Sequence, residues 1–268
     1  VGAHIIHYLL EKSRIIEQTD EERNYQVFYR LCRGAPKGMR DALNINPDAG
    51  AYNFMKKSML GDIPFLDDVK DFAEQEKSMS DCGLESSEKA DIFRVTAAVM
   101  HMGNIEFVDG EDGAAIAGHC DATVTGCAAM MGLEVDSLRQ NLTSKEISIG
   151  GSTTRKALNL RDAQFGLWGL AKTTYSKLFD WIIDRINTCF PYPQDKSVNY
   201  IGILDIAGFE YFRHNSFEQF CINFCNEKLQ QLFIQLVLTA EQEEYAREGI
   251  EWTKIDYFDN GPIVDLIM

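Results

Sequence analysis

The 268-residue sequence lacks several features that would have set its class at once. No apolar run is long enough to cross a bilayer, and the N-terminus lacks a signal-peptide pattern. We expect both ends to be cuts inside a longer chain. The seven cysteines show neither CxxC nor paired-histidine spacing, which argues against a zinc site and favours reduced thiols in a cytosolic compartment. A formal net charge of -15 argues against nucleic acid or an anionic membrane as partners.

The phosphate-binding lysine loop, G-x-x-x-x-G-K-[ST], is also missing. Residues 150–156 are its nearest imitation, but their spacing is wrong. Phosphoryl transfer depends on positioning and charge stabilisation, and that loop supplies much of both. We therefore expect this segment alone to be unable to hydrolyse a nucleotide.

The most informative stretch that is present spans residues 198–210. An apolar run, Tyr200 to Leu204, ends in Asp205, and Gly208 follows three positions later. Such a run predicts a strand buried on both faces, and ligands of open α/β sheets bind beyond the carboxyl ends of strands. An Asp there can hold Mg²⁺ through water, and a Gly lets the backbone approach a phosphate. A buried strand followed by an ordinary turn is the alternative, since Asp and Gly are common turn residues.

A long helix is predicted directly after this stretch. Ser216 and Gln219 have capping-box spacing, and apolar residues then recur at helical intervals with no Pro or Gly until Gly249. These signals predict a helix from about Ser216 to about Arg247 that could carry a small shift far from the turn. A helix that serves only packing is the alternative. Cys221 and Cys225 lie one helical turn apart, so we expect both to face the core.

Residues 204–231 carry a specific resemblance. LDIAGFEYF at 204–212 resembles switch II of the myosin motor-domain family, and NSFEQFCINF and NEKLQQ, at 215–224 and 226–231, resemble its relay helix. A joined match over about thirty residues is far more specific than a lone motif. The resemblance implies a mostly helical α/β fold: part of a P-loop NTPase-type motor core with strands of a central sheet and long helices.

The resemblance also implies roles for individual residues, with ATP and Mg²⁺ as cofactors. Asp205 would hold a Mg²⁺-bound water, the Gly208 N–H would contact the γ-phosphate, and Glu210 would pair with a switch I arginine and help to place the attacking water. Glu210 and Gly208 are therefore the catalytic candidates. The implied nucleotide contacts are Asp205, Ile206, Ala207, Gly208 and Phe209. Mechanical coupling would run through Ser216 and Phe217 to Trp252 in the relay loop; a core position for Trp252 is the alternative.

The remaining patterns predict further elements in order. A strand is expected at 5–15, whose YLLEKSR also resembles the family, and a helix at 20–32 with Asp20 as its cap. Other helices are expected at 67–79, 86–102, 121–131, 135–142 and 160–190. Loops with short helices are expected at 34–61, and loops at 109–118 and 143–154.

The polar stretch 143–154 lies where the family has an actin-contacting loop. The family places a regulatory residue sixteen positions before a DALAK-like segment, which here begins at Trp168, so the resemblance points to Ser152. A phosphate there would add negative charge facing actin. An unmodified loop serine is the alternative.

Taken over residues 1–268, the resemblance implies an internal fragment of one motor domain. Residues 1–197 would be mostly the upper 50 kDa region, 198–215 the switch II strand and loop, and 216–268 the relay helix, relay loop and start of the lower 50 kDa region. The implied function is a cytoplasmic motor of the actin cytoskeleton that couples ATP hydrolysis to movement along the actin filament, with the converter and light-chain-bearing neck of the same heavy chain as partners. A truncated or degenerate motor that binds actin or a partner without turnover is the alternative.

Overall fold

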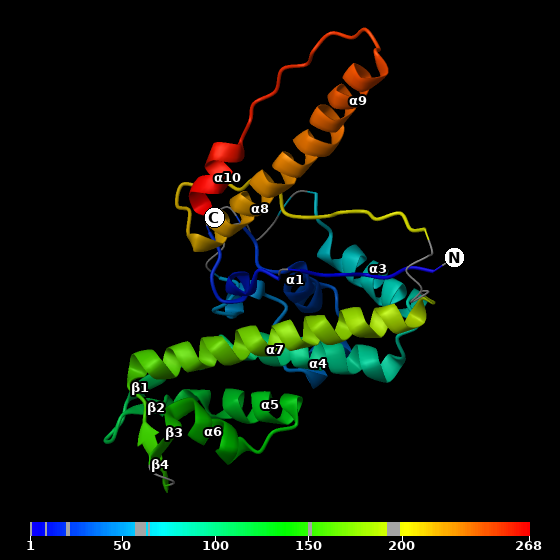
Figure 1. Cartoon of the computed structure of the whole chain (residues 1–268). Helices are drawn as coiled ribbons and strands as arrows, with labels where there is room; N and C mark the ends of the chain where they lie inside the picture. Colours follow the sequence, from blue (N-terminus) through cyan, green and yellow to red (C-terminus); the bar gives the residue numbers. More distant parts are fainter. Residues whose placement is uncertain are drawn as a thin grey trace. The chain divides into compact units, whose positions relative to one another are not determined.

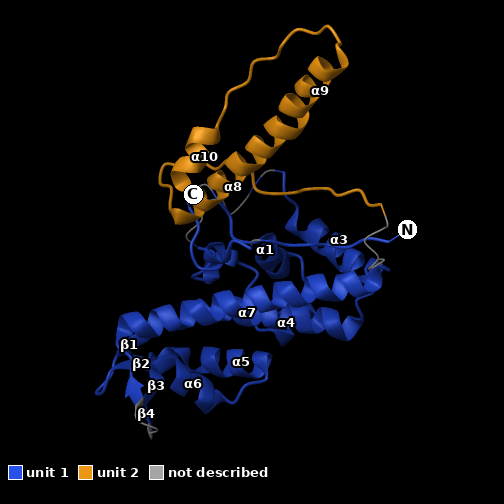
Figure 2. Ribbon diagram, in the orientation of Figure 1, with its two compact units in different colours: residues 1–195 blue, residues 196–268 orange. Residues whose placement is uncertain are grey.

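The computed structural model describes residues 2–8, 10–19, 22–56, 63, 65–149, 152–191 and 199–268. The chain divides into two compact units, residues 1–195 and 196–268 (Figure 2). Both are mostly helical, as predicted (Figure 1). Among the described residues, no helix is both long and apolar enough to span a membrane.

The first unit is built around two long helices, α4 and α7, which lie side by side in Figure 1. Its other helices are shorter and are joined by two β-hairpins and three 3-10 turns, Lys12–Ile15, Ala49–Ala51 and Gly118–Cys120. The helices are α1 Gln26–Arg33, α2 Lys37–Ala42, α3 Asp68–Asp81, α4 Ser86–Met102, α5 Asp121–Met131, α6 Val135–Thr143 and α7 Leu160–Cys189.

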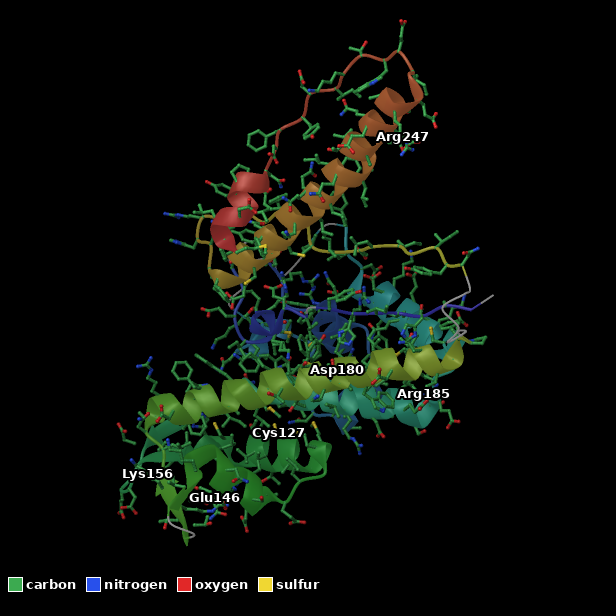
Figure 3. The ribbon with its side chains drawn as sticks, in the orientation of Figure 1. Cys127, Glu146, Lys156, Asp180, Arg185 and Arg247 are labelled. Carbon is green, nitrogen blue, oxygen red and sulfur yellow. The ribbon has the colours of Figure 1, made fainter. Side chains whose placement is uncertain are left out.

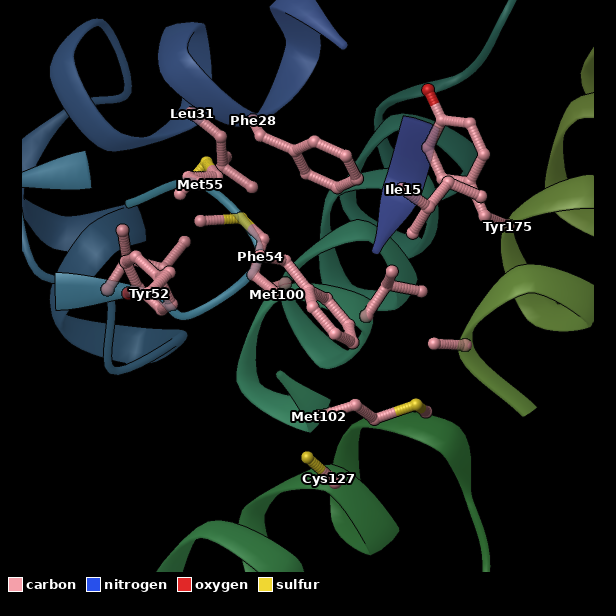
Figure 4. Packing of buried hydrophobic residues seen from close by; sticks show 14 of the residues in the cluster. Ile15, Phe28, Leu31, Tyr52, Phe54, Met55, Met100, Met102, Cys127 and Tyr175 are labelled. Carbon is pink, nitrogen blue, oxygen red and sulfur yellow. The ribbon is translucent and has the colours of Figure 1, made fainter. Parts of the chain in front are cut away.

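Helix α4 is the centre of the hydrophobic core, part of which Figure 4 shows. It contacts α1, α3, α5 and α7, and most of its apolar side chains are buried. Phe93 stacks near Phe72 of α3, with 5.2 Å between the ring centroids. Burying one such side chain contributes about 1.5–3 kcal/mol to stability, so this core positions the ends of α4 and α7 firmly.

Several helices begin and end where the sequence predicts. Helix α4 begins with a Glu85–Glu88 capping box, and α7 begins where the Asn159 Oδ1 atom accepts a hydrogen bond of 2.8 Å from the Asp162 N–H. Both lie within a residue of their predicted spans, and α5 matches its predicted span. Side-chain caps mark the starts of α4 and α7, whereas α5 begins without a capping side chain, so cap chemistry is one of the local signals that locate helices and not the whole of them.

The N-terminal part of the first unit differs from its prediction. The expected strand at 5–15 is irregular at residues 5–8 and 10–11 and then forms the 3-10 turn Lys12–Ile15. Arg14 pairs with both Glu11 and Glu22 at 2.6 Å, and these ion pairs hold the chain folded on itself. Helix α1 begins at Gln26, because the preceding Asn24 side chain donates to two carbonyls distant in sequence. The expected cap, Asp20, lies outside the described residues.

Two predicted loops contain antiparallel hairpins. Strands β1 (Phe107–Asp109) and β2 (Ala114–Ile116) lie within or next to the predicted loop 109–118. Strands β3 (Ser144–Ile149) and β4 (Ser152–Ala157) replace the predicted loop 143–154. Alternating polar and β-branched residues on either side of a Gly-Gly pair are a hairpin pattern, and that pattern was missed. The two glycines, 150 and 151, lie outside the described residues.

The second unit confirms the long helix. Helix α8 (Phe217–Phe233) continues through a π-helical segment, Ile234–Thr239, into α9 (Ala240–Glu248). Gly249 ends the helix with a left-handed backbone, φ 70°, as the sequence indicates, and α10 (Gly261–Ile267) follows. The π-helical segment was not predicted. The expectation that Cys221 and Cys225 both face a core is wrong, since Cys221 is half-buried and Cys225 is exposed.

The predicted buried strand before this helix is also wrong. Residues 199–210 have no regular structure, and Ile201 and Ile203 are 96% and 93% exposed. A strand is stabilised by hydrogen bonds to a neighbouring strand, and among the described residues no strand lies beside this one. The strands of a central sheet are accordingly absent from the described parts of the chain, where β1–β2 and β3–β4 are the two sheets.

Candidate functional site

The predicted site residues 205–210 form an irregular segment that precedes α8 in the second unit. Asp205 and Gly208 are exposed, and Phe209 is largely exposed. A methyl group placed on Gly208 would meet no atom within 4 Å. The backbone at Gly208 therefore has open space beside it, which is the access that a phosphate would need.

The backbone of Glu210 is fixed to helix α8 by one side chain. The Asn223 Oδ1 atom accepts a hydrogen bond from the Glu210 N–H, and the Asn223 Nδ2 atom donates to the Glu210 carbonyl, both at 2.8 Å. We call this pair of hydrogen bonds the Asn223 clamp. Because it satisfies both backbone groups of one residue, Glu210 cannot turn about its backbone without breaking it.

The carboxylate of Glu210 is held by the residue that also caps α8. Gln219 donates from Nε2 to Glu210 Oε2 at 3.3 Å, while its Oε1 atom accepts from the Ser216 N–H at 2.8 Å. The predicted capping box is thereby confirmed, and Gln219 is only 7% exposed. The same side chain thus starts the helix and orients the candidate catalytic acid.

A third contact joins the segment to α8 one turn further along. The Asn226 Nδ2 atom donates to the Ala207 carbonyl at 3.0 Å. Gln219, Asn223 and Asn226 have i, i+4, i+7 spacing and share one face of the helix. Neither Asn223 nor Asn226 was predicted as a site residue, because the contacts of this stripe of amides exist only where the loop lies beside the helix.

Asp205 can contribute to a cation site only together with other groups. Among the described residues, no cluster of three or more His, Cys, Asp or Glu side chains could hold a metal ion. One carboxylate is what Mg²⁺ takes from a protein when substrate phosphates and water supply its other ligands. The residues present therefore fit the indirect role predicted for Asp205.

The far end of the long helix is tied to the segment that follows it. Gln242 accepts from the Ile255 N–H at 3.1 Å and donates to the Ile255 carbonyl at 3.3 Å. Trp252 is half-buried and meets the ring of Tyr245 edge-on, with 5.9 Å between centroids. Trp252 is therefore neither a core residue nor fully exposed, and its surroundings depend on α9. At the other end, the Phe217 side chain is 75% exposed.

The β3–β4 hairpin carries an unusual charge pattern in the first unit. Lys145 lies directly opposite Lys156, and Glu146 pairs with Arg155 at 2.7 Å. Glu146 and Lys156 are labelled on this hairpin in Figure 3. Like charges placed directly opposite each other destabilise a hairpin. A sequence that keeps them presents positive charge at this point of an otherwise acidic chain. Ser152, the candidate phosphorylation site, is the first residue of β4.

Comparison with known proteins extends over the whole chain. A family model described as "Myosin head (motor domain)" matches residues 1–268. Unconventional myosin-VI of Mus musculus is 41% identical over 304 residues, which cover 100% of this chain and 24% of that protein. Unconventional myosin-Ia of Rattus norvegicus is 42% identical, covering 100% of this chain and 32% of that protein. Myosin-1 of Emericella nidulans is 44% identical, covering 100% and 22%. The chain thus spans about a quarter of the length of the curated relatives it matches.

Proposed function

The chain belongs to the myosin motor-domain family, and we propose that it forms the part of an actin-based motor in which a phosphate-sensing loop meets the helix that carries movement away from it. The observation that carries this proposal is the set of hydrogen bonds from Gln219, Asn223 and Asn226 of α8 to residues 207–210. Through them, a displacement of the loop becomes a displacement of the helix. The family match and the relatives favour this motor over a binder without turnover.

At the loop, the roles follow from the chemistry of the residues. The terminal phosphate of ATP would be lined by residues 205–209, which include Ile206, Ala207 and Phe209. The Gly208 N–H would donate a hydrogen bond to this phosphate. Asp205 would hold a water of the Mg²⁺ ion, which neutralises phosphate charge when bound. Glu210, held by Gln219, would place the attacking water. These groups position the reactants, which is the main protein contribution to phosphoryl transfer.

Helix α8 and its continuation through α9 then transmit the displacement of the loop. When the loop closes on the phosphate, the Asn223 clamp obliges the start of α8, at Ser216 and Phe217, to follow the Glu210 backbone. The continuous helix 217–248 carries that shift to its far end. There Trp252 packs on Tyr245, so its surroundings report the movement and pass it to the converter and neck of the same heavy chain.

The β3–β4 hairpin is the proposed contact with the actin filament. Its opposed lysines attract an acidic surface, and this attraction is local because the chain as a whole is negative. A phosphate on Ser152 would put a charge of about -2 at the start of β4, four positions before Lys156 in the same strand. The proposed location is the cytoplasmic actin cytoskeleton. The segment assignments 1–197, 198–215 and 216–268 are part of the same proposal.

The test is actin-activated ATPase activity of the full-length parent protein, with Glu210→Ala as the variant. We expect turnover that rises with actin and falls by about 10²–10⁴-fold in the variant, the usual contribution of a general acid or base. Glu241→Ala, which removes an exposed carboxylate at the start of α9, is the matched control and should leave turnover unchanged. A parent that binds actin without turnover would establish the non-catalytic binder. Turnover unaffected by Glu210→Ala would refute the site.

A further inference from the structure

The cysteines of the first unit differ sharply in their surroundings. Cys32, Cys120 and Cys127 are buried, and burial raises the pKa of both Cys32 and Cys127 to about 12. Such thiols stay protonated and are shielded from solution, so they are poor nucleophiles. Cys82 and Cys189 are instead half-buried. Solvent-borne reagents can therefore reach these two.

Cys189 is the last residue of α7 and lies against an arginine that binds several groups. Arg185 contacts the Cys189 Sγ atom at 2.8 Å and Thr188 Oγ1 at 3.2 Å through Nη1. It also binds both carboxylate oxygens of Glu88, at 2.7 and 3.1 Å, and donates to the Gly83 carbonyl at 2.8 Å. Figure 3 shows Arg185 near the end of α7. A fixed guanidinium beside an accessible sulfur is the environment in which cysteines react with oxidants.

The same arginine holds the residue that follows a second cysteine. Cys82 is the C-cap of α3, and Gly83 follows it with a left-handed backbone, φ 74°. A methyl group on Gly83 would lie 3.2 Å from the Cys189 Sγ atom and 3.9 Å from the Cys189 Cβ atom. Cys82 is one Cα step of about 3.8 Å from that glycine. Gly83, the residue that follows Cys82, is thus held beside Cys189 by Arg185, although the two residues are 106 positions apart in sequence.

From this juxtaposition we infer that Cys189 is an oxidation site and that Cys82 resolves it, so that hydroperoxides convert the pair into a reversible disulfide. In a reducing compartment the pair rests as thiols and the disulfide is transient. The inference requires neither ATP nor actin, and its failure would leave the proposed motor function untouched.

The chemistry balances with one hydroperoxide. The Cys189 thiolate attacks the terminal peroxide oxygen, an S–O bond forms, the O–O bond breaks, and the leaving oxygen takes a proton to become an alcohol, or water from hydrogen peroxide. The Cys82 sulfur then attacks Cys189, the S–S bond forms, and the hydroxyl leaves with the proton of Cys82 as water. Two thiols and one hydroperoxide thus give a disulfide, an alcohol and water.

The experiment treats the full 268-residue chain with hydrogen peroxide, blocks free thiols, and maps disulfide-linked peptides by mass spectrometry with and without reductant. We expect a linked Cys82–Cys189 peptide that is lost in Cys82→Ser and in Cys189→Ser, and retained in the matched control Cys225→Ser, which alters an exposed cysteine of the second unit. A sulfenic-acid trap should label Cys189 in the Cys82→Ser chain.

Arg185→Gln separates the arginine's effect from mere proximity. Formation of the linked peptide should slow several-fold in this variant, since the positive charge beside the sulfur is gone. If no linked peptide forms while Cys225 is oxidised, or if the trap labels Cys225 as readily as Cys189, the inference is overturned.

Discussion

Replacing Asn223 by Ala should separate the loop from the helix while leaving every proposed phosphate contact in place. The two hydrogen bonds of the Asn223 clamp are each 2.8 Å long. Each contributes about 0.5–1.5 kcal/mol net, so the variant should lose roughly 1–3 kcal/mol of coupling. A coupling free energy of that size corresponds to about 5–150-fold in the linked equilibrium.

The assay follows Trp252 fluorescence and ATP turnover together in the full-length parent, with its other tryptophans replaced by Phe. In the parent, nucleotide should change the signal, because Trp252 packs on Tyr245 at the end of α9. In Asn223→Ala we expect the linked equilibrium to weaken by about 5–150-fold, and the fluorescence change to shrink as a result. Gln235→Ala is the matched control, an exposed amide of the π-helical segment that lies outside the stripe formed by Gln219, Asn223 and Asn226. A full Trp252 response in Asn223→Ala would refute the clamp as the route of transmission.

Three further predictions concern the first unit. Asp68→Ala should lower the free energy of unfolding in urea by about 3–5 kcal/mol, because the buried Arg23 guanidinium, whose side chain is 3% exposed, loses its partner at 2.9 Å. As a control, Asp71→Ala breaks a partly exposed ion pair with Arg30 and should cost about 1 kcal/mol or less. Burial lowers the pKa of His101, so the unfolded chain binds the His101 proton more tightly than the folded chain does. The free energy of unfolding should therefore fall as the pH drops below about 6.5. His101→Gln should remove this part of its pH dependence when unfolding is measured between about pH 5 and 8. Lys156→Ala should weaken actin cosedimentation and reduce its salt dependence, and an unchanged salt dependence would exclude the hairpin as the contact.

Elements with local signals could be predicted from the sequence. The helices α4 and α7 begin at side-chain caps, and the long helix after Ser216 has both a capping box and an uninterrupted apolar period. These signals act within a few residues, so no knowledge of the rest of the molecule was needed. The π-helical segment at 234–239 had no such signal, since its composition is that of an ordinary helix.

Elements that depend on distant partners could not be predicted. The apolar run at 200–204 has the composition of a buried strand, but strands form only where a neighbour pairs with them. Asn24 shows the same dependence for the start of a helix, because its hydrogen bonds to the carbonyls of Ile15 and Phe54, which are distant in sequence, set where α1 begins. For the site, the resemblance supplied the loop residues, whereas Asn223 emerged only when the loop and helix were placed together.

The amide stripe on α8 holds the backbone of Glu210 and thereby allows hydrolysis and movement to be altered separately. An asparagine can accept and donate at once, so Asn223 holds the N–H and the carbonyl of Glu210, which neither a carboxylate nor a lysine could do. The helix is therefore tied to the Glu210 backbone, while the proposed hydrolysis needs its carboxylate. Glu210→Ala should then lower turnover by about 10²–10⁴-fold but keep a nucleotide-dependent Trp252 signal. Asn223→Ala should do the reverse and retain some turnover with little signal. If both variants lost both properties equally, hydrolysis and transmission would share one contact, and the division between side chain and backbone would be wrong.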